Sequence, residues 1–326
     1  MRGASTRPHI AALVPLVVGI VTLLVAASAT VVARTSSRAA LAFLAGRPAD
    51  AATVGTTGTT VPPPLPGPLS DPKSLDAALA AIGYPVPAGA KVYAAKVTST
   101  PRGLSYDDYQ AGGGALGQDF WPASSIKVLA AVGALEFIGK LGFTGGATVS
   151  FAGSSATTTV AAVYDAAIRV SSNADYDTLV EIAGVDWLNR EFLTPARGFP
   201  ATVIQRSYAG GDLYHTPAMT LTEAGRKATV PARASSVDAS CPAGNCSDLF
   251  EMSESVRRVV LNDEIPEADR FHIAPADVAG LSGSLLAAEG WFAPAVVRVL
   301  GAGARIYSKP GYVPNLDCMD VTLIDA

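Results

Sequence analysis

Hydrophobic and polar residues divide this chain into three stretches. Residues 9–33 contain no Asp, Glu, Lys or Arg and are mainly Val, Leu, Ile and Ala. A helix of this length would extend about 37 Å, enough to cross a bilayer. Residues 34–72 are rich in Ala, Thr, Gly and Pro, which predicts an extended linker. From residue 73 to residue 326, apolar positions recur with the periods of helices and strands and predict one folded domain.

Within this domain, helical and strand patterns are mixed. Apolar residues with helical spacing, bounded by polar caps or glycine, predict helices. Runs of β-branched, aromatic and alternating residues predict strands. We expect helices at 74–82, 124–139, 163–170 and 173–184, and strands at 91–97, 304–312 and 320–325.

The apolar segment 9–33 fits either an uncleaved membrane anchor or a cleaved signal peptide. Arginines flank it on both sides, so charge alone does not set its orientation. The small residues at 27–29 fit a signal-peptide cleavage site, which would make the domain a secreted one. The apolar run continues through 30–33, which favours an uncleaved anchor. We therefore expect residues 1–8 in the cytoplasm, a single pass through the cell membrane and an exported domain.

Composition narrows the classes of partner and fold. Hydrophobic residues make up 49% of the 326 and charged residues 16%, so a sizeable core is expected. The length left after the linker suits one large α/β or α+β unit. The net charge is -4, and like charges do not cluster in runs, which argues against nucleic acid as a partner.

Three cysteines are present, and two of them lie close together. Cys241 and Cys246 bracket a short turn, so in an oxidising compartment we expect a disulfide between them. Two unrelated thiols are the alternative. Zinc is disfavoured because no histidine or second cysteine pair lies at ligand spacing, and we expect neither a metal nor a cofactor.

A serine and a lysine at the start of the helix predicted at 124–139 suggest nucleophilic chemistry. Ser124 and Lys127 are three residues apart and share one helical face. A serine hydroxyl needs a neighbouring base, and a lysine serves as that base only when its pKa is lowered. We therefore expect the two side chains within hydrogen-bond reach. The competing interpretation is a capping serine followed by a solvated lysine.

Two further polar motifs follow. Ser171 and Asn173 lie at a predicted corner between two helices, where they either face a cleft or cap a helix. Lys309 and Gly311 lie on the strand predicted at 304–312. There the lysine can bind a substrate carboxylate, and the glycine permits close backbone approach.

In this order, the three motifs resemble those of the penicillin-recognising serine hydrolases, the class A β-lactamases and low-molecular-mass penicillin-binding proteins. The family implies an α+β domain with an antiparallel sheet flanked by helices and an all-helical lobe. It also implies a β-lactam or a peptidoglycan peptide as substrate. Because 320–325 resembles the strand after K-x-G, we expect a final strand and helix to be missing from the C-terminus.

The resemblance also implies a role for each motif residue. Ser124 is the acylated nucleophile, Lys127 its base, and Ser171 a proton relay. Asn173 holds the substrate amide and Lys309 its carboxylate. The oxyanion hole consists of the backbone N–H groups of Ser124 and of Tyr312, the residue after Gly311.

Three departures from the family pattern affect the expected activity. Ser172 replaces an aspartate, and Pro310 replaces a residue whose hydroxyl binds the carboxylate. No Glu-x-x-Leu-Asn string occurs; Asp186 to Asn189 is closest, with its acid one residue late. We therefore expect slow deacylation. The alternative is a catalytically degraded module that binds or senses cell-wall peptides or β-lactams.

Residues 112–117 match a glycine-rich dinucleotide-binding fingerprint, but the sequence around them does not fit such a site. It would need an acidic residue at the end of a strand. Glu136, at the required distance, lies within a predicted helix instead.

Overall fold

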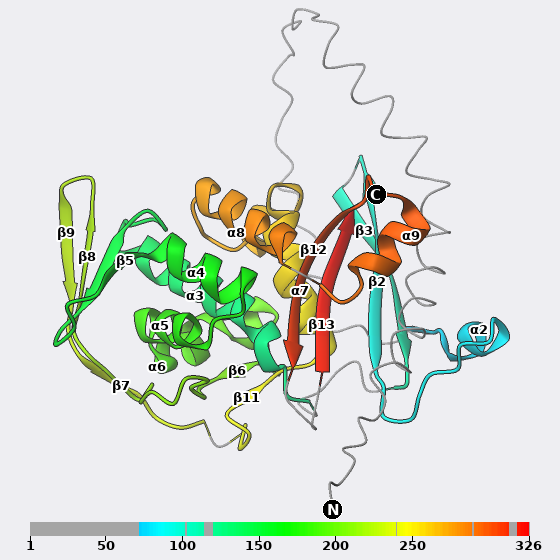
Figure 1. Cartoon of the computed structure of the whole chain (residues 1–326), viewed down its shortest axis with the longest axis horizontal. Helices are drawn as coiled ribbons and strands as arrows, with labels where there is room; N and C mark the ends of the chain where they lie inside the picture. The colour runs from blue at the N-terminus through cyan, green and yellow to red at the C-terminus, as the bar shows by residue number, and fades with distance from the viewer. Residues whose placement is uncertain are drawn as a thin grey trace, which may run out of the picture.

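The computed structural model describes residues 72–101, 103–113, 120–238, 240–288, 290–312 and 318–325. The expected tail (1–8), the membrane segment (9–33) and all but the last residue of the linker (34–72) lie outside these residues. Within the described part of the chain, no helix combines the length and the apolar character needed to cross a bilayer. The described elements form an α+β fold, as expected (Figure 1).

Helices and short helical turns cluster in the middle of the chain. The α-helices are α2 (Asp76–Ala81), α3 (Lys127–Lys140), α4 (Val160–Arg169), α5 (Asn173–Ala183), α6 (Val185–Trp187), α7 (Leu249–Val260), α8 (Pro275–Ala287) and α9 (Ala293–Leu300). The shorter turns are η1 (Ala123–Ile126), η2 (Leu188–Phe192), η3 (Pro195–Arg197), η4 (Asn262–Glu264) and η5 (Glu267–Asp269).

The longest strands lie near the two ends of the described chain. They are β2 (Val92–Thr100), β3 (Gly103–Ala111), β12 (Arg305–Tyr312) and β13 (Cys318–Asp325). The shorter ones are β1 (Lys73–Ser74), β4 (Thr148–Phe151), β5 (Thr157–Thr159), β6 (Val203–Ile204), β7 (His215–Thr216), β8 (Met219–Glu223), β9 (Arg226–Val230), β10 (Arg233–Ala234) and β11 (Asn245–Cys246).

One lobe is built on α3, which is buried on nearly all sides because its sequence is almost wholly apolar. Helices α4 and α5 pack against it. The expectation of an all-helical lobe is wrong, because the sheet β5-β4-β8-β9 adjoins these helices (Figure 1). In β8, Met219 and Leu221 enter the core while Thr220 and Thr222 do not. Strands of three to five residues show too little alternation to be recognised, and β4 pairs with β8 about 70 residues away.

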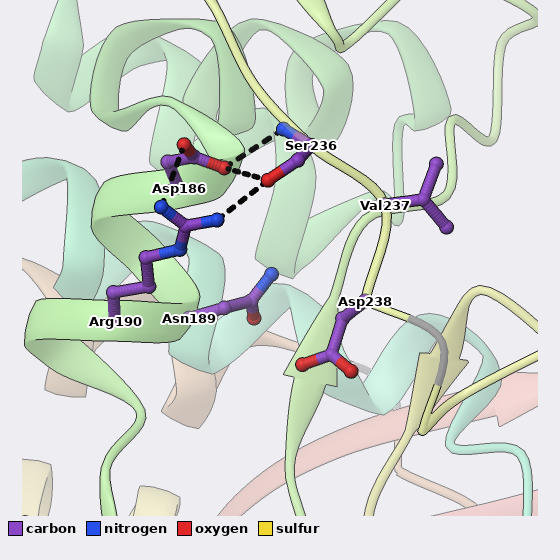
Figure 2. A pocket seen from close by; sticks show the side chains of 6 residues that line it. All are labelled: Asp186, Asn189, Arg190, Ser236, Val237 and Asp238. Carbon is purple, nitrogen blue, oxygen red and sulfur yellow. Dashed lines mark hydrogen bonds and ion pairs between the residues drawn. The ribbon is translucent and has the colours of Figure 1, made fainter.

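A small polar pocket lies between α6 and the chain that follows β10 (Figure 2). The Asp186 carboxylate accepts a hydrogen bond from Ser236 N at 2.9 Å and forms an ion pair with Arg190 at 3.4 Å. Asn189 exchanges two hydrogen bonds with the backbone of Ile204, each 2.9 Å long. These contacts hold the chain that follows β10 and the short strand β6 against α6 and η2.

The other lobe contains the long strands, in two separately hydrogen-bonded groups. β2 and β3 form an antiparallel hairpin, with the short β1 parallel to β3. β12 and β13 form a second antiparallel pair. Within the described residues the two groups share no ladder, but α7 contacts β2, β12 and β13. This helix is therefore the common support of both groups.

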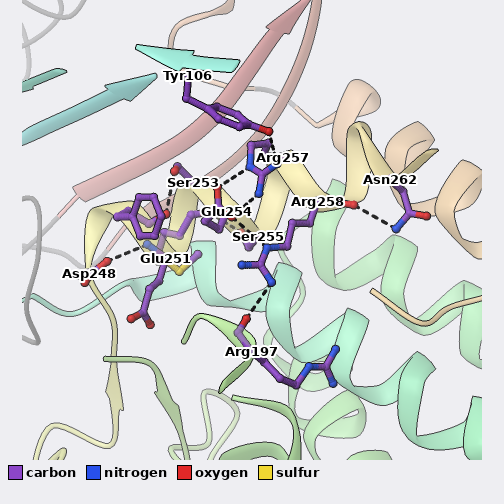
Figure 3. A network of polar contacts seen from close by, with 12 residues as sticks. Tyr106, Arg197, Asp248, Glu251, Ser253, Glu254, Ser255, Arg257, Arg258 and Asn262 are labelled. Carbon is purple, nitrogen blue, oxygen red and sulfur yellow. Dashed lines mark hydrogen bonds and ion pairs between the residues drawn. The ribbon is translucent and has the colours of Figure 1, made fainter. Parts of the chain in front are cut away.

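A buried network of charges on α7 ties the lobes together (Figure 3). Glu254 accepts hydrogen bonds from Arg257 and Arg258. Arg257 also donates to the Tyr106 hydroxyl of β3 at 2.6 Å, and Arg258 to the Arg197 carbonyl of η3 at 2.8 Å. The polar side chains of α7 thus form their hydrogen bonds with other groups of the protein rather than with solvent.

Candidate active site

Ser124 lies in a tight turn at the junction of the two lobes. It belongs to η1, directly before α3, and its side chain is partly exposed. The preceding Ala123 has a φ of 47°, which is disfavoured for a residue with a Cβ. The Ser125 hydroxyl donates to the Pro122 carbonyl at 2.5 Å and closes the turn. We call residues 122–125 the nucleophile turn.

Lys127 begins α3 and points into the interior. Its side chain is fully buried, at 0% exposure. Nζ donates to the Ser171 carbonyl at 2.6 Å and to Asn173 Oδ1 at 2.7 Å, with Ser171 Oγ at 3.4 Å. The sharp corner between α4 and α5 supplies all three acceptors, so the lysine holds this corner against the start of α3.

The two helices meet at a corner here, as expected. Ser171 takes a positive φ of 59°, and the Ser172 hydroxyl caps α5 by accepting from Asp175 N at 3.3 Å. The Ser172 hydroxyl is therefore the cap of α5. Ser171 and Asn173 stay free of the cap and point to Lys127.

Lys309 approaches the same corner from β12 in the other lobe. It is 1% exposed, and its Nζ donates to Ser171 Oγ at 2.9 Å and to the Pro310 carbonyl at 3.0 Å. Ser171 therefore lies between two amines, one from each lobe.

Gly311 brings β12 into contact with the nucleophile turn. A Cβ added to Gly311 would lie 2.8 Å from Pro122 O, Ser124 N and Ser125 N, closer than real Cβ atoms come. Only glycine fits this approach. Tyr312 follows, with its side chain 55% exposed.

The pKa values of both lysines are lowered. Burial, and next the charge of Lys309, lower the pKa of Lys127 to about 7. Burial lowers the pKa of Lys309 to about 8, against the opposing charge of Asp320. At neutral pH much of Lys127 is unprotonated while Lys309 remains largely charged. This division is the one that a general base and an anion-binding group require.

The structure gathers the backbone of Ser124 with Lys127, Ser171, Asn173, Lys309 and Gly311. The direct hydrogen bond expected between Ser124 and Lys127 does not occur among the described residues, since the lysine is bonded to the corner instead. Such bonds often tighten only when substrate is bound.

The fold resembles that of class A β-lactamases. An ancestral class A β-lactamase matches with a TM-score of 0.47 and 20% identity, over 73% of this chain and 80% of that one. PenP from Rhodopseudomonas palustris, a putative class A enzyme, gives 0.47 and 19% over 73% and 80%. The class A β-lactamase from Mycobacterium abscessus gives 0.45 and 15% over 73% and 79%. No protein-family model and no curated sequence matches the chain.

The segment from Asp186 to Asn189, the nearest match to a Glu-x-x-Leu-Asn string, makes contacts within the fold. The Asp186 carboxylate is engaged by Ser236 and Arg190, and Asn189 by the Ile204 backbone (Figure 2). Glu136, the residue considered for a dinucleotide site, lies within α3 and forms an ion pair with Arg197 at 2.6 Å. Residues 114–117 of that glycine-rich match lie outside the described part of the chain.

The two neighbouring cysteines are joined. Cys241 and Cys246 form a disulfide, and we call residues 241–246 the disulfide loop. Across the described residues, no group of three or more His, Cys, Asp or Glu side chains has an arrangement suited to a metal ion.

Sequence reasoning missed one side chain at the nucleophile turn. The Tyr208 hydroxyl donates to the Ala123 carbonyl at 2.8 Å, and the centre of its ring lies 5.8 Å from Lys127 Nζ. Its segment, rich in glycine and serine, carries no recognisable motif. Contacts with Asp177 and Asn245, remote in sequence, bring it to the site.

Proposed function

We propose that this protein is a serine hydrolase that forms an acyl-enzyme on Ser124 with a β-lactam or an acyl-D-Ala type of amide. The observation that carries the proposal is the pair of buried lysines, Lys127 and Lys309, that meet at Ser171 beside the nucleophile turn. One amine is poised to accept a proton and the other to hold an anion. A purely structural corner would not need two buried amines with lowered pKa values.

In the proposed acylation, each group at the site has a defined task. Neutral Lys127 takes the proton from the Ser124 hydroxyl, and Oγ attacks the amide carbon. The negative charge that forms on the carbonyl oxygen is held by the N–H groups of Ser124 and Tyr312. The proton returns from Lys127 through the Ser171 hydroxyl, 3.4 Å away, to the leaving nitrogen as its bond to carbon breaks. Asn173 orients the substrate amide throughout.

Lys309 is the group we propose for the substrate carboxylate. Pro310 offers no hydroxyl, and the buried Ser308 hydroxyl is already bonded to Asp320 at 2.6 Å. A hydrogen bond to a charged group contributes about 1.5–3 kcal/mol. We therefore expect weaker initial binding than a site with a serine or threonine at position 310 would give.

We propose that the acyl-enzyme hydrolyses slowly. Among the described residues, no carboxylate hydrogen-bonds to Ser124 or Lys127. A water molecule that attacks an ester without a positioned base loses roughly 10²–10⁴-fold in rate. The adduct should therefore persist long enough to be isolated.

Intact-mass spectrometry after incubation with penicillin tests the proposal. Full-length wild type should gain one penicillin mass, and tandem spectra should place it on Ser124. The variant Ser124→Ala should remain unlabelled. Ser154→Ala is the matched control, because this exposed serine lies in the turn between β4 and β5, and it should label like wild type.

The other outcomes discriminate between alternatives. Penicillin binding without an adduct or hydrolysis would favour the binding or sensing module, for which Pro310 is the supporting observation. Fast multiple turnover would show that a base activates the deacylating water, and the slow-deacylation proposal would be wrong.

We also propose that the domain is exported and tethered by residues 9–33, or secreted if that segment is cleaved. The Cys241–Cys246 disulfide supports this location, because such bonds persist in oxidising compartments. Cell fractionation followed by immunoblotting should find the full-length protein with membranes. Recovery in the soluble cytoplasmic fraction would refute the proposal.

A further inference from the structure

Tyr208 is the only aromatic residue among those described whose hydroxyl is bonded to the nucleophile turn. It donates to the Ala123 carbonyl at 2.8 Å and accepts from Trp121 Nε1 at 3.2 Å. Burial raises the pKa of Tyr208, so the hydroxyl stays protonated and able to donate. Its ring stacks on Tyr176 with 4.5 Å between centroids and an interplanar angle of 27°.

The backbone around Tyr208 is held from two directions. The buried Asp177 carboxylate of α5 accepts from Tyr208 N at 2.8 Å and from Ala209 N at 3.0 Å. On the other side, Asn245 of the disulfide loop accepts from Gln205 N at 2.9 Å and Arg206 N at 3.0 Å. The hydroxyl therefore reaches the turn from a fixed base rather than from a free loop.

The bond to Ala123 bears directly on Ser124 because a peptide unit is planar. The carbonyl of Ala123 and the N–H of Ser124 belong to one rigid group and point in opposite directions. A donor that fixes the carbonyl also fixes the direction of the N–H. It further polarises the peptide, which makes the N–H a stronger donor. The Ser124 nitrogen faces β12, since a Cβ on Gly311 would lie 2.8 Å from it.

The disfavoured backbone conformation of Ala123 explains why the hydrogen bond from Tyr208 matters. Its φ of 47° is a conformation that alanine rarely adopts, so the peptide that follows would relax if nothing held it. The Ser125 hydroxyl holds the turn at the Pro122 carbonyl, and the Tyr208 hydroxyl holds it at the Ala123 carbonyl.

We infer that Tyr208 is a positioning residue for the oxyanion site, whose hydroxyl aims the Ser124 N–H at the carbonyl oxygen of the bound substrate. The inference rests on the proposed acylation of Ser124. It assigns Tyr208 no contact with substrate and no proton transfer. Its effect is exerted through the Ala123–Ser124 peptide alone.

The variant Tyr208→Phe isolates the hydroxyl, because the ring and its stacking on Tyr176 remain. Removing an oxyanion donor costs roughly 10²–10³-fold in rate, and loosening one costs less. We expect acylation by a fluorescent penicillin to slow about 10-fold. Affinity for a boronic acid that forms a tetrahedral anion on Ser124 should fall by a similar factor, while the pH dependence of acylation stays unchanged.

Two other variants complete the test. Tyr106→Phe removes a hydroxyl that accepts from Arg257 at 2.6 Å in the other lobe, and it should leave the rate and the boronate affinity as in wild type. Trp121→Phe leaves the bond to Ala123 but frees the Tyr208 hydroxyl to rotate, so a loss of about 2–5-fold is expected. This variant decides the question if Tyr208→Phe does not fold.

The outcomes separate the inference from the function on which it rests. No adduct on wild-type Ser124 overturns both. Wild-type labelling with an unchanged rate and unchanged boronate affinity in folded Tyr208→Phe overturns the inference alone. A slower rate with unchanged boronate affinity, or a shifted pH profile, also overturns it, because the hydroxyl would then act on Lys127 or on substrate entry.

Discussion

Two lysine side chains at the centre of the site are almost fully buried, which is unusual for this residue. Each has hydrogen-bond acceptors but no carboxylate partner among the described residues. Lys127 holds the corner between α4 and α5, and Lys309 joins that corner to β12. Burial disfavours the charged form of each amine and so lowers the pKa of both lysines.

These two lysines predict a bell-shaped pH dependence of acylation. Lys127 works only unprotonated, so the rate should rise with pH through about 7. Lys309 works only charged, so the rate should fall as pH rises through about 8. The second-order rate constant for penicillin labelling, measured from pH 5 to pH 10, should peak between these values.

The variant Lys309→Arg provides the control, because a guanidinium stays charged over this range. It should lose the falling limb and keep the rising one. A wild-type rising limb centred near pH 10 would contradict the assignment of Lys127 as the base.

The close packing at Gly311 predicts that a single added methyl group slows acylation and destabilises the fold. In Gly311→Ala, the new methyl group meets backbone atoms of Pro122 and Ser124 that cannot rotate away. A displacement near 1 Å at a reacting centre costs about 10²-fold in rate. We expect penicillin labelling to slow by about that factor and the free energy of unfolding to fall by about 1–3 kcal/mol.

Gly303→Ala is the matched control near the same strand. Nothing lies within 4 Å of the added Cβ at that exposed position, so labelling and stability should match wild type. Equal labelling rates for Gly311→Ala and wild type would mean that the contact with the nucleophile turn is unimportant.

At the scale of elements, sequence reasoning succeeded where local signals were strong. The helix after Ser124, the two helices around Ser171 and the strand carrying Lys309 all lie close to their expected positions. Apolar periodicity and capping residues are local properties, so they can be read without a structure. The motif residues that the sequence indicated, from Ser124 to Tyr312, lie within these four elements or directly beside them.

Elements defined by distant contacts were not predicted. The segment around Tyr208 has no periodicity, and its course depends on Asp177 and Asn245. The sheet β5-β4-β8-β9 consists of short strands, and its central pair, β4 with β8, joins residues about 70 positions apart. The Ser124–Lys127 bond was expected from helical spacing alone, but the corner residues compete for the same amine. In each case a tertiary contact outweighs a local preference.

The disulfide loop predicts a measurable contribution to stability. Closing so short a loop in the unfolded chain should contribute about 2 kcal/mol by the chain-entropy estimate. The double variant Cys241→Ser, Cys246→Ser should lower the free energy of unfolding in urea by about that amount. Reductant should destabilise wild type and leave the double variant unaffected; equal sensitivity of the two proteins would contradict the prediction.

At the scale of the whole molecule, α7 supports both groups of long strands and also reaches the helical lobe. Its buried network joins β3 to η3 through Glu254, Arg257 and Arg258 (Figure 3). Burial opposes the charge on Glu254, but the hydrogen bonds and charges of the two arginines keep its pKa below the usual range. One carboxylate therefore balances two buried guanidinium groups.

Removing that carboxylate charge should destabilise the fold strongly. Glu254→Gln keeps the shape but leaves two buried cations uncompensated, which costs about 3–5 kcal/mol. Chemical unfolding measures this loss. Asp107→Asn is the control, because its ion pair with Lys73 is exposed, and no measurable change is expected. Similar losses of unfolding free energy in both variants would show that the buried network on α7 stabilises the fold no more than an exposed ion pair does.

The position of Ser171 between Lys127 and Lys309 has a consequence for motion. One residue receives hydrogen bonds from two amines that belong to opposite lobes. A hinge movement that parted β12 from the corner would break the Lys309–Ser171 contact and separate the proposed anion-binding group from the proposed proton relay. We therefore expect the grouping of Lys127, Ser171 and Lys309, on which the proposed acylation depends, to exist only while the two lobes are in contact.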